Sequence, residues 1–545
     1  MKKRNKAVCI LLAIMLLVSG CGKETKKEEA TLINSAPLNI IDDNYRNYYE
    51  VFVYSFCDGD GDGIGDFKGL TSKLDYINDG DDKTDSDMGF NGIWLMPIMQ
   101  STTYHKYDVV DYYNIDKEYG TLDEFKAFMA ECDKRNIKVI LDLVMNHTSS
   151  QHEWFIEATE YIKSLKEGQE PSAKENKYFG YYNFTKEPQG TKYYQVGNTE
   201  WYYEAGFVSE MPDLNLGNQE VRKEFEEIVK YWMDLGVGGF RLDAAKEYYS
   251  DNTEKNNEVL AWLNHTVKAI DKDAYIVAEV WTPFNTYSQY YKSGIDSVFD
   301  FAFADANGKI VKTLNYTGSD NSGKALGQSF ITLQEKLSEL NPNYIDAPFF
   351  TNHDLARAAG YFSGDNQTEK TKMAGAINLM MNGSAFVYYG EELGMNGSGI
   401  DENKRAPMRW SKEETKEGMC RGPVAMERIE QEYDSLEEQQ KDDNSIYNFY
   451  KQAVKLRNQN PEIARGLVTY IDEVTDEDIC AITKEYNGSK IHILMNVSAE
   501  AKSVSLSKET YSYNELRGAL KTGKDNVLLK GETVKLPPYS VAILK

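Results

Sequence analysis

The segment GGFRLDAA, residues 238–245, decides the fold class because it is a short apolar run that carries a charged pair. The run is continuous rather than alternating, as in a strand that helices cover on both faces. Arg241 and Asp243 are two residues apart, so their side chains share one face of the strand. The segment therefore predicts a buried parallel strand with polar chemistry at its carboxyl end.

Seven further runs of this kind recur between polar stretches. The stretches 122–136 and 219–235 have the apolar spacing of amphipathic helices. Repeated strand–helix alternation predicts an α/β protein built on a (β/α)₈ TIM barrel. An open α/β sheet is the alternative, but no glycine-rich phosphate loop opens a helix. The expected strands are 51–56, 92–98, 138–146, 238–245, 275–281, 297–303, 346–354 and 384–391.

Two departures from this repeat predict further domains. A long stretch rich in Tyr, Asn, Lys and Gly separates the third and fourth expected strands, which predicts an inserted domain B over 148–216. After residue 466, short strand-like runs alternate with turns, which predicts a C-terminal antiparallel β-sandwich, domain C, over 467–545. The catalytic barrel, domain A, would then comprise 45–147 and 217–466.

The amino terminus has the pattern of an export signal. A basic start precedes the apolar run 7–18, which is too short to cross a bilayer core of about 30 Å. The sequence VSGC at 18–21 resembles a bacterial lipobox, so we expect a lipoprotein signal peptide over 1–20 and lipidation of Cys21. Residues 21–44 would form a flexible tether at the outer face of the cell membrane. A simple signal peptide or an anchor helix is the alternative.

Composition excludes several classes of partner. With 545 residues and 41% apolar content, the chain is long enough for several domains around a large core. Its net charge of −25 repels phosphate backbones, so nucleic acid is not expected as a partner. The 38 tyrosines suit a carbohydrate ligand, because each ring offers a flat face and a hydroxyl. The cysteines show no CxxC spacing, and we expect free thiols in the mature protein.

Carboxylates stand at the ends of several expected strands. Glu279 lies among apolar residues, an environment that raises the pKa of a carboxyl group and suits a general acid. Arg241 favours the ionised form of Asp243, which suits a nucleophile. Two other strands end in 146–147 (Asn-His) and 352–354 (Asn-His-Asp). Each motif alone is explained by an ion pair or a capping loop, but barrel strand ends meet at one face, where they predict a single site.

Together these motifs resemble the α-amylase superfamily, glycoside hydrolase family 13, over residues 45–545. The resemblance implies a retaining glycosidase that acts on α-glucosides, with Asp243 as nucleophile and Glu279 as acid/base. Asp354 would bind sugar hydroxyls and favour ring distortion. The segments that carry the resemblance are 142–147, 211–215, 239–246, 279–281, 352–354 and 388–392.

The resemblance also implies residues that hold the sugar. Tyr107 would stack on the sugar at the cleaved bond, and Lys246 would reach the sugar on the leaving side. Many α-amylases have His after this Lys, whereas this chain has Glu247, which puts the leaving-side contacts in doubt. The implied substrate-binding residues are Tyr107, His147, Arg241, Lys246 and His353.

The loop DGDGDGIGD, residues 58–66, predicts a structural Ca²⁺ site, because its oxygen ligands recur at the spacing that this ion needs. An EF-hand would have Glu at offset 12, where this chain has Gly69, and the loop resembles instead the calcium loop of oligo-1,6-glucosidases. An acidic solvent loop is the alternative. A second metal near Asn146 and Asp213, as in many amylases, is left open. The expected ligands are Asp58, Asp60, Asp62, Asp66 and the carbonyl of Ile64.

The signals for the cleaved bond are mixed. The calcium loop and RAPMRW at 405–410 resemble exo-acting oligo-1,6-glucosidases, whereas 211–215 and Lys246 are typical of endo-acting α-1,4 enzymes. This combination resembles the intermediate subfamily of bacterial α-amylases. We expect a monomeric, endo-acting α-1,4-glucan hydrolase that degrades starch and maltooligosaccharides at the cell surface.

Two alternatives of function remain. One is an exo-acting α-glucosidase, an oligo-1,6-glucosidase or a 4-α-glucanotransferase of the same fold. The other is a non-catalytic surface lipoprotein that binds glucan. The presence of Asp243, Glu279 and Asp354 argues against the second, because family members that only bind have lost their carboxylates.

Overall fold

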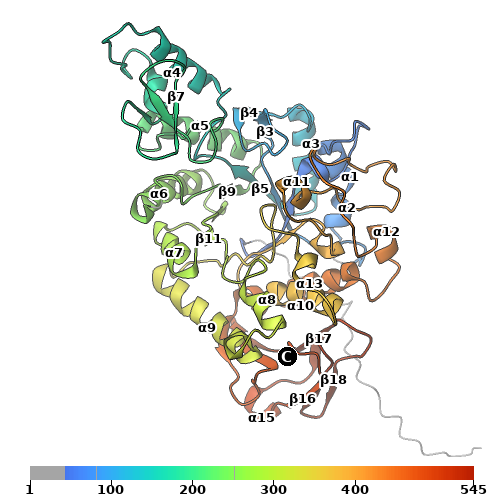
Figure 1. The fold of residues 1–545 in the computed structure, drawn as a ribbon. Helices are drawn as coiled ribbons and strands as arrows, with labels where there is room; N and C mark the ends of the chain where they lie inside the picture. The colour runs from blue at the N-terminus through green and yellow to red at the C-terminus, as the bar shows by residue number, and fades with distance from the viewer. Residues whose placement is uncertain (1–42, 82, 251) are drawn as a thin grey trace, which may run out of the picture.

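The computed structural model describes residues 43–81, 83–250 and 252–545, so the expected signal peptide, Cys21 and most of the tether lie outside the described residues. A seven-stranded parallel sheet forms the centre of the molecule (Figure 1). Isolated parallel bridges from Phe299 to Ala347 and from Phe349 to Phe386 close it into a barrel. The strands, in order around the sheet, are β11 (Ser297–Val298), β10 (Tyr275–Ala278), β9 (Gly239–Leu242), β5 (Lys138–Leu143), β2 (Gly92–Leu95), β1 (Asn47–Val51) and β12 (Ala385–Tyr388).

Six of these strands lie within the expected runs, but the first prediction is wrong in position. The strand is β1, and Val53–Ser55 forms the 3-10 helix η1 instead. Tyr48 fixes the register of β1, because its ring lies against Gly92 of β2, where an added Cβ would come within 2.5 Å of it. The seventh strand is reduced to the two bridges, since Pro348 between them has no N–H for a ladder.

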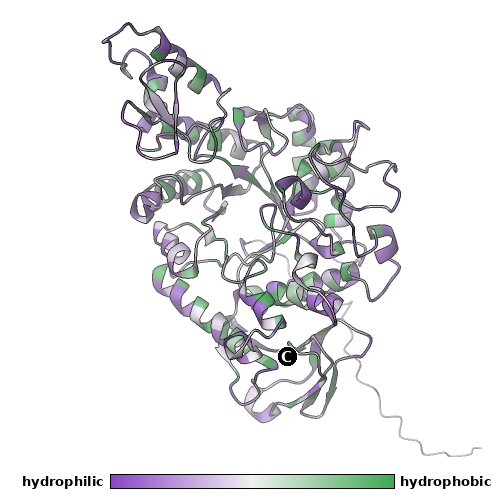
Figure 2. Ribbon diagram, viewed as in Figure 1, coloured by the Kyte–Doolittle hydropathy of each residue, from purple (hydrophilic) through white to green (hydrophobic). Residues whose placement is uncertain are grey.

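Helices cover the outer face of the barrel. α5 shows why they form: Asn218 caps it, and its buried stripe of Val221, Phe225, Ile228, Val229 and Trp232 faces the strands. Figure 2 shows apolar residues along the central strands and polar residues on the outer helices. The helices of this part are α1 (Phe67–Ser72), α2 (Leu74–Ile77), α3 (Leu122–Lys134), α5 (Gln219–Asp234), α6 (Thr253–Ile270), α7 (Phe284–Tyr287), α8 (Lys309–Leu314), α9 (Gly323–Leu340), α10 (Gln367–Met380), α11 (Asp401–Lys404), α12 (Leu436–Gln439), α13 (Ile446–Gln459) and α14 (Glu462–Arg465).

Two excursions leave the barrel near the carboxyl ends of its strands. The hairpin β3 (Met99–Ser101) and β4 (Val109–Ile115) follows β2. Domain B follows β5 and projects from the barrel in Figure 1; the bridge from His147 to Asp213 ties it to the end of β5, and the bridge from Tyr182 to Leu214 lies within domain B. Its elements are α4 (Glu153–Ser164), β6 (Phe184–Thr185), β7 (Tyr193–Gln195) and β8 (Tyr202–Glu204).

Domain C packs against the side of the barrel opposite domain B (Figure 1). It contains two antiparallel sheets, ordered β13-β14-β15-β20-β17 and β16-β19-β18, with an apolar core between them. β17 and β19 lie outside the strand-like runs of the sequence, which are 467–470, 479–484, 491–496, 503–506, 526–529 and 540–544. The predicted fold class, a TIM barrel with domain B and a C-terminal β-sandwich, is confirmed. The elements are β13 (Leu467–Tyr470), β14 (Ile479–Tyr486), β15 (Ser489–Asn496), β16 (Lys502–Ser505), α15 (Lys508–Tyr511), β17 (Leu516–Lys521), β18 (Leu528–Lys530), β19 (Thr533–Leu536) and β20 (Ser540–Leu544).

The cysteines in the described part of the chain are buried free thiols: Cys57, Cys132, Cys420 and Cys480. Among the residues that the structure describes, no helix combines the length and apolar character needed to cross a membrane.

Candidate active site

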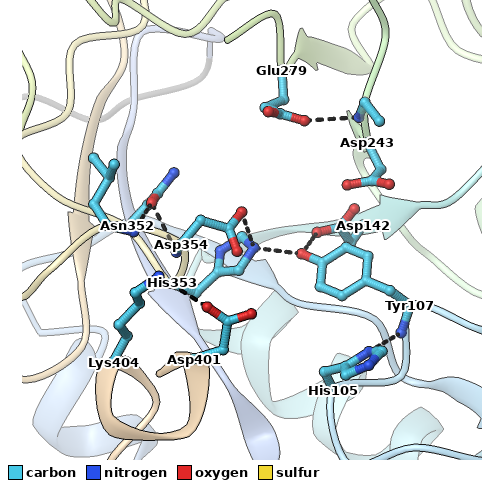
Figure 3. A network of polar contacts seen from close by, with 12 residues as sticks. His105, Tyr107, Asp142, Asp243, Glu279, Asn352, His353, Asp354, Asp401 and Lys404 are labelled. Carbon is cyan, nitrogen blue, oxygen red and sulfur yellow. Dashed lines mark hydrogen bonds and ion pairs between the residues drawn. The ribbon is translucent and has the colours of Figure 1, made fainter. Parts of the chain in front are cut away.

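A single buried guanidinium, that of Arg241 on β9, organises the carboxylates at the strand ends. Its Nη1 donates to Asp142 Oδ1 and to Asp243 Oδ1, both at 2.7 Å. Its Nη2 lies 3.4 Å from Glu279 Oε2. Burial acts to lower the pKa of Arg241, but these carboxylates raise it above its ordinary value. Arg241 therefore remains charged and contacts carboxylates from three strands, those of Asp142, Asp243 and Glu279, whose positions Figure 3 shows.

Glu279, directly after β10, is held as a proton donor. Burial raises its pKa to about 7, and the nearby Asp243 and Asp354 add to the shift, while Arg241 opposes it. Its Oε2 accepts the backbone N–H of Ala244 at 2.8 Å. Ala244 has φ 47°, a left-handed conformation that turns this N–H toward Glu279. Because Oε2 is engaged, Oε1 is the oxygen left to carry the proton.

His353 and Asp354 form a charged pair at the end of the seventh strand segment. The Nδ1 of His353 contacts Glu50 Oε1 at 2.5 Å, and its Nε2 lies 3.1 Å from Asp354 Oδ2. Burial opposes a charge on His353, but Asp354 and Glu50 raise its pKa to about 9. Burial likewise acts to raise the pKa of Asp354, but His353 and Arg405 hold it below its ordinary value. Arg405 Nη2 lies 2.9 Å from Asp354 Oδ1, so Asp354 is ionised between two cations.

Tyr107 connects these two groups, as Figure 3 shows. Its hydroxyl donates to Asp142 Oδ2 at 2.9 Å and meets His353 Nε2 at 2.7 Å. Its ring stacks on His353 with centroids 5.6 Å apart. The Nε2 of His147 contacts the carbonyl of Tyr107 at 3.2 Å. Of the predicted sugar-binding residues, Tyr107, His147, Arg241 and His353 therefore lie in one network.

Lys246 stands apart from that network, on the side where domain B meets the barrel. Its Nζ lies 3.3 Å from Glu247 Oε1, and the other oxygen of Glu247 lies 3.4 Å from Lys192 Nζ in domain B. The departure from the α-amylase pattern at Glu247 thus has a structural role, because it links Lys246 to domain B. Asn146 donates to Asp213 Oδ1 at 3.1 Å in the same region, where a second metal was left open.

The predicted calcium loop brings part of its ligand set together. Oxygens of Asp58, Asp60 and Asp66 lie within 4.8 Å of one another. Asp58 accepts the backbone N–H groups of Gly61 and Gly63 at 2.7 Å each, which fixes its carboxylate. Carboxylate-only donors of this kind fit Ca²⁺. Asp62 lies outside this cluster, and its Oδ1 accepts the N–H of Ile64 at 2.7 Å.

Four residues of the network were not predicted as site residues. Asp142 appeared only as part of a motif, and Arg405 only as a sign of the subfamily. Glu50 was missed because the first strand was placed after it, although a lone carboxylate in the apolar run 47–51 is a signal for a buried partner. Tyr104, whose hydroxyl meets Arg405 Nη1 at 3.1 Å, gave no separate signal.

Comparison with known proteins decides the family. Residues 50–466 match the family model for the alpha amylase catalytic domain. The chain belongs to the α-amylase family. It is 36% identical to Alpha-amylase 3 of Dictyoglomus thermophilum, over 92% of this chain and 93% of the relative. It is 27% identical to an oligo-1,6-glucosidase of Bacillus cereus, over 91% and 98% of the two chains.

A solved structure of this family confirms the architecture. Eubacterium rectale Amy13B superposes with a TM-score of 0.89 at 49% identity, covering 94% of this chain and 97% of that one. This α-amylase family member is thus a glycoside hydrolase with a TIM barrel, a domain B and a C-terminal β-sandwich. Its carboxylates meet where barrel enzymes carry their chemistry, at the carboxyl ends of the strands.

Proposed function

We propose that the protein is a retaining, endo-acting α-1,4-glucan hydrolase that degrades starch and maltooligosaccharides. The observation that carries this proposal is the geometry around Arg241, which donates to Asp243 at 2.7 Å and lies 3.4 Å from Glu279. Asp243 accepts a charge-assisted hydrogen bond at 2.7 Å, while burial raises the pKa of Glu279 to about 7. A nucleophile needs the first environment, and a general acid needs the second.

The reaction would proceed by double displacement. An Asp243 oxygen attacks the anomeric carbon as the glycosidic C–O bond breaks, and the proton of Glu279 passes to the leaving oxygen. Glu279, now ionised, then takes a proton from water, whose oxygen attacks the anomeric carbon and releases Asp243. Glu279 is reprotonated in this step, so the cycle closes without another reactant.

The surrounding charges would stabilise the transition state. The sugar develops positive charge at the anomeric carbon, and the carboxylates of Asp142, Asp243 and Asp354 form a fixed anionic surround. His353 and Arg405 hold Asp354 in its ionised form, so that it can bind sugar hydroxyls. Arg241 keeps the group compact without supplying a proton.

Endo action is supported by the segment 211–215 and by Lys246, which are typical of endo-acting α-1,4 enzymes. The relative named α-amylase agrees with this proposal, and the relative named oligo-1,6-glucosidase keeps exo action as the second candidate.

A product time course on starch and maltoheptaose would test this function. We expect an early spread of short maltooligosaccharides with the α-anomer formed first, as seen by NMR, and no products from Glu279→Gln or Asp243→Asn. Glucose alone from the first minutes would indicate an exo-glucosidase, and lengthened products would indicate a glucanotransferase. Glucan binding without turnover would leave the non-catalytic lipoprotein.

We also propose that the enzyme works at the outer face of the cell membrane as a monomer, held by lipid on Cys21. The lipobox-like VSGC sequence supports this location. The wild-type protein should sediment with membranes and partition into detergent, whereas Cys21→Ala should be recovered in the aqueous phase with unchanged specific activity. Equal partitioning of both would overturn the lipid anchor.

The Asp58 loop is proposed to hold a structural Ca²⁺ through Asp58, Asp60 and Asp66. The ion would join the loop after β1 to α1, which Asp66 caps. EDTA should lower the Tm of the wild type, and added Ca²⁺ should restore it. Asp60→Ala should abolish this response, whereas Asp81→Ala, in the separate acidic segment 79–87, should keep it. A Tm that ignores EDTA would overturn the site.

A further inference from the structure

Lys106 has an unusual backbone conformation next to an active-site residue. Its φ is 64°, in the left-handed region that long side chains rarely adopt. Of the non-glycine residues with positive φ in the described parts of the chain, Lys106 and Ala244 directly adjoin Tyr107 and Asp243. Such a conformation persists only where the surroundings enforce it.

The side chain of Lys106 shows what enforces it. The residue is 2% exposed, and its ammonium lies 3.2 Å from Asp116 Oδ1 and 2.5 Å from Glu118 Oε2. The ammonium also lies over the ring of the buried Tyr119, 5.4 Å from its centroid. A buried lysine is costly unless it is paired, so these contacts fix where the side chain can lie.

Two carboxylates, those of Asp116 and Asp108, hold the rest of the segment. Asp116, just after β4, accepts the N–H groups of Ser101 and Glu118 at 3.0 Å each. At the other end, Asp108 accepts the hydroxyl of Ser101 at 2.5 Å and those of Thr102 and Thr103. The segment 101–108 is therefore held at both ends, and Lys106 joins it to Asp116 and Glu118, which follow β4.

Tyr107 is the residue that this arrangement directs into the site. Its hydroxyl reaches Asp142 and His353, and its carbonyl reaches His147. A rotation at residue 106 would move both groups together, because they belong to one peptide segment. The position of Tyr107 therefore depends on the conformation of Lys106.

We propose that Lys106 is a positioning residue, whose ion pairs with Asp116 and Glu118 hold the left-handed turn that sets Tyr107 between Asp142 and His353. This inference rests on the proposed function only for its kinetic effect. The ammonium of Lys106 contacts Asp116 and Glu118 rather than the reacting carboxylates, so Lys106 acts through Tyr107.

Lys106→Met would test this role, with Lys484→Met as the matched control. Lys484 is also a buried lysine, but it donates to Met380 and Ile463 carbonyls beside domain C, away from the site. We expect Lys106→Met to lower kcat about ten- to a hundredfold, with little change in KM, because Tyr107 would be displaced by about 1 Å. Lys484→Met should keep kcat.

Two further variants separate position from stability. Asp116→Asn added to Lys106→Met should restore Tm, because it removes the unpaired buried carboxylate, but should not restore kcat. Lys106→Gly should lose less activity than Lys106→Met, since glycine adopts the left-handed turn without strain. Recovery of kcat together with Tm in the double variant would overturn the proposal.

A spectroscopic measurement makes the test independent of turnover. The imidazole N–H signals of His353 in ¹⁵N-histidine-labelled protein, identified with Tyr107→Phe, should shift in Lys106→Met and stay in place in Lys484→Met. Unchanged signals would overturn the positioning role even if kcat fell. Shifted signals in a protein that cleaves no glucan would retain the positioning role and refute the proposed function instead.

Discussion

Two buried arginines, one at each end of the barrel, have pKa values that their surroundings shift in opposite directions. Arg241 faces carboxylates, and its pKa is raised above the ordinary value despite burial. Arg457, beside domain C, donates to the carbonyls of Leu379, Met381 and Gly383. Burial lowers the pKa of Arg457 to about 9, because carbonyls solvate its charge without neutralising it.

The difference separates a reactive site from a structural one. Backbone carbonyls keep the same charge at every pH and cannot react, so the contacts of Arg457 and the neighbouring Lys484 with the end of α10 and the residues after it are structural. The carboxylates around Arg241 change charge with pH and can attack or protonate a substrate. The molecule thus uses buried cations for two purposes, and the type of acceptor decides which.

The largest effect is expected from Arg241→Met, which leaves three carboxylates without their cation. Activity should fall about 10²–10³-fold, and the free energy of unfolding should fall by about 3–5 kcal/mol. Denaturant titration and starch hydrolysis measure both. Arg241→Lys, the control, should keep more stability than activity, because one ammonium cannot contact all three groups. Activity within tenfold of wild type in Arg241→Met would contradict the comparison.

Ala244→Val should come next, because it acts on one carboxylate rather than three. A β-branched residue is strongly disfavoured at φ 47°, so the N–H should turn away from Glu279 Oε2. We expect kcat to fall about a hundredfold, as for a misplacement of about 1 Å. Ala244→Gly accepts the same φ and should remain active. Equal activity of the two variants would show that this hydrogen bond is dispensable.

The pH dependence of kcat/KM should distinguish the region around Arg241 from the region around Arg457. Glu279 must be protonated to donate, and its pKa is raised to about 7, so kcat/KM should be retained below pH 7 and lost as pH rises through it. The fall should approach tenfold per pH unit. The profile in Lys484→Met should match the wild type. A flat kcat/KM up to pH 9 would exclude Glu279 as the titrating acid.

The smallest effect on activity is expected around Arg457 and Lys484, at the end of the barrel that packs against domain C. Lys484→Met leaves the carbonyls of Met380 and Ile463 without their donor and should lower the free energy of unfolding by about 1–3 kcal/mol. Its kcat should equal that of the wild type when measured well below Tm. A loss of kcat would mean that the two ends are coupled through α10, against the separation drawn above.

The sequence was sufficient where the chemistry lies within one motif. Arg241 and Asp243 share a strand face, and Glu279 interrupts an apolar run, so their environments followed from neighbours in sequence. The contact between Glu50 and His353 joins residues 303 positions apart, and no local sequence pattern predicts it. Strand β1 was misplaced for a related reason: its register depends on Gly92 of the next strand, which leaves room for Tyr48.

Motif resemblance and contact geometry also differ in what they say about single residues. The resemblance placed His147 against the sugar, and the structure adds that its Nε2 already contacts the Tyr107 carbonyl. It placed Lys246 on the leaving side, and the structure adds the ion pairs through Glu247 to Lys192. Such additions depend on side-chain directions, which neither spacing nor hydrophobic pattern encodes.

Chemical labelling of the buried thiols would report the order in which the barrel and domain C unfold. Cys132 lies on α3 of the barrel and Cys480 on β14 of domain C, and both are about 1% exposed or less. Burial raises the pKa of both thiols, which further protects them from alkylation. A thiol reagent would therefore modify each only after its own surroundings unfold, and mass spectrometry of the labelled peptides would order the loss of the two domains during heating.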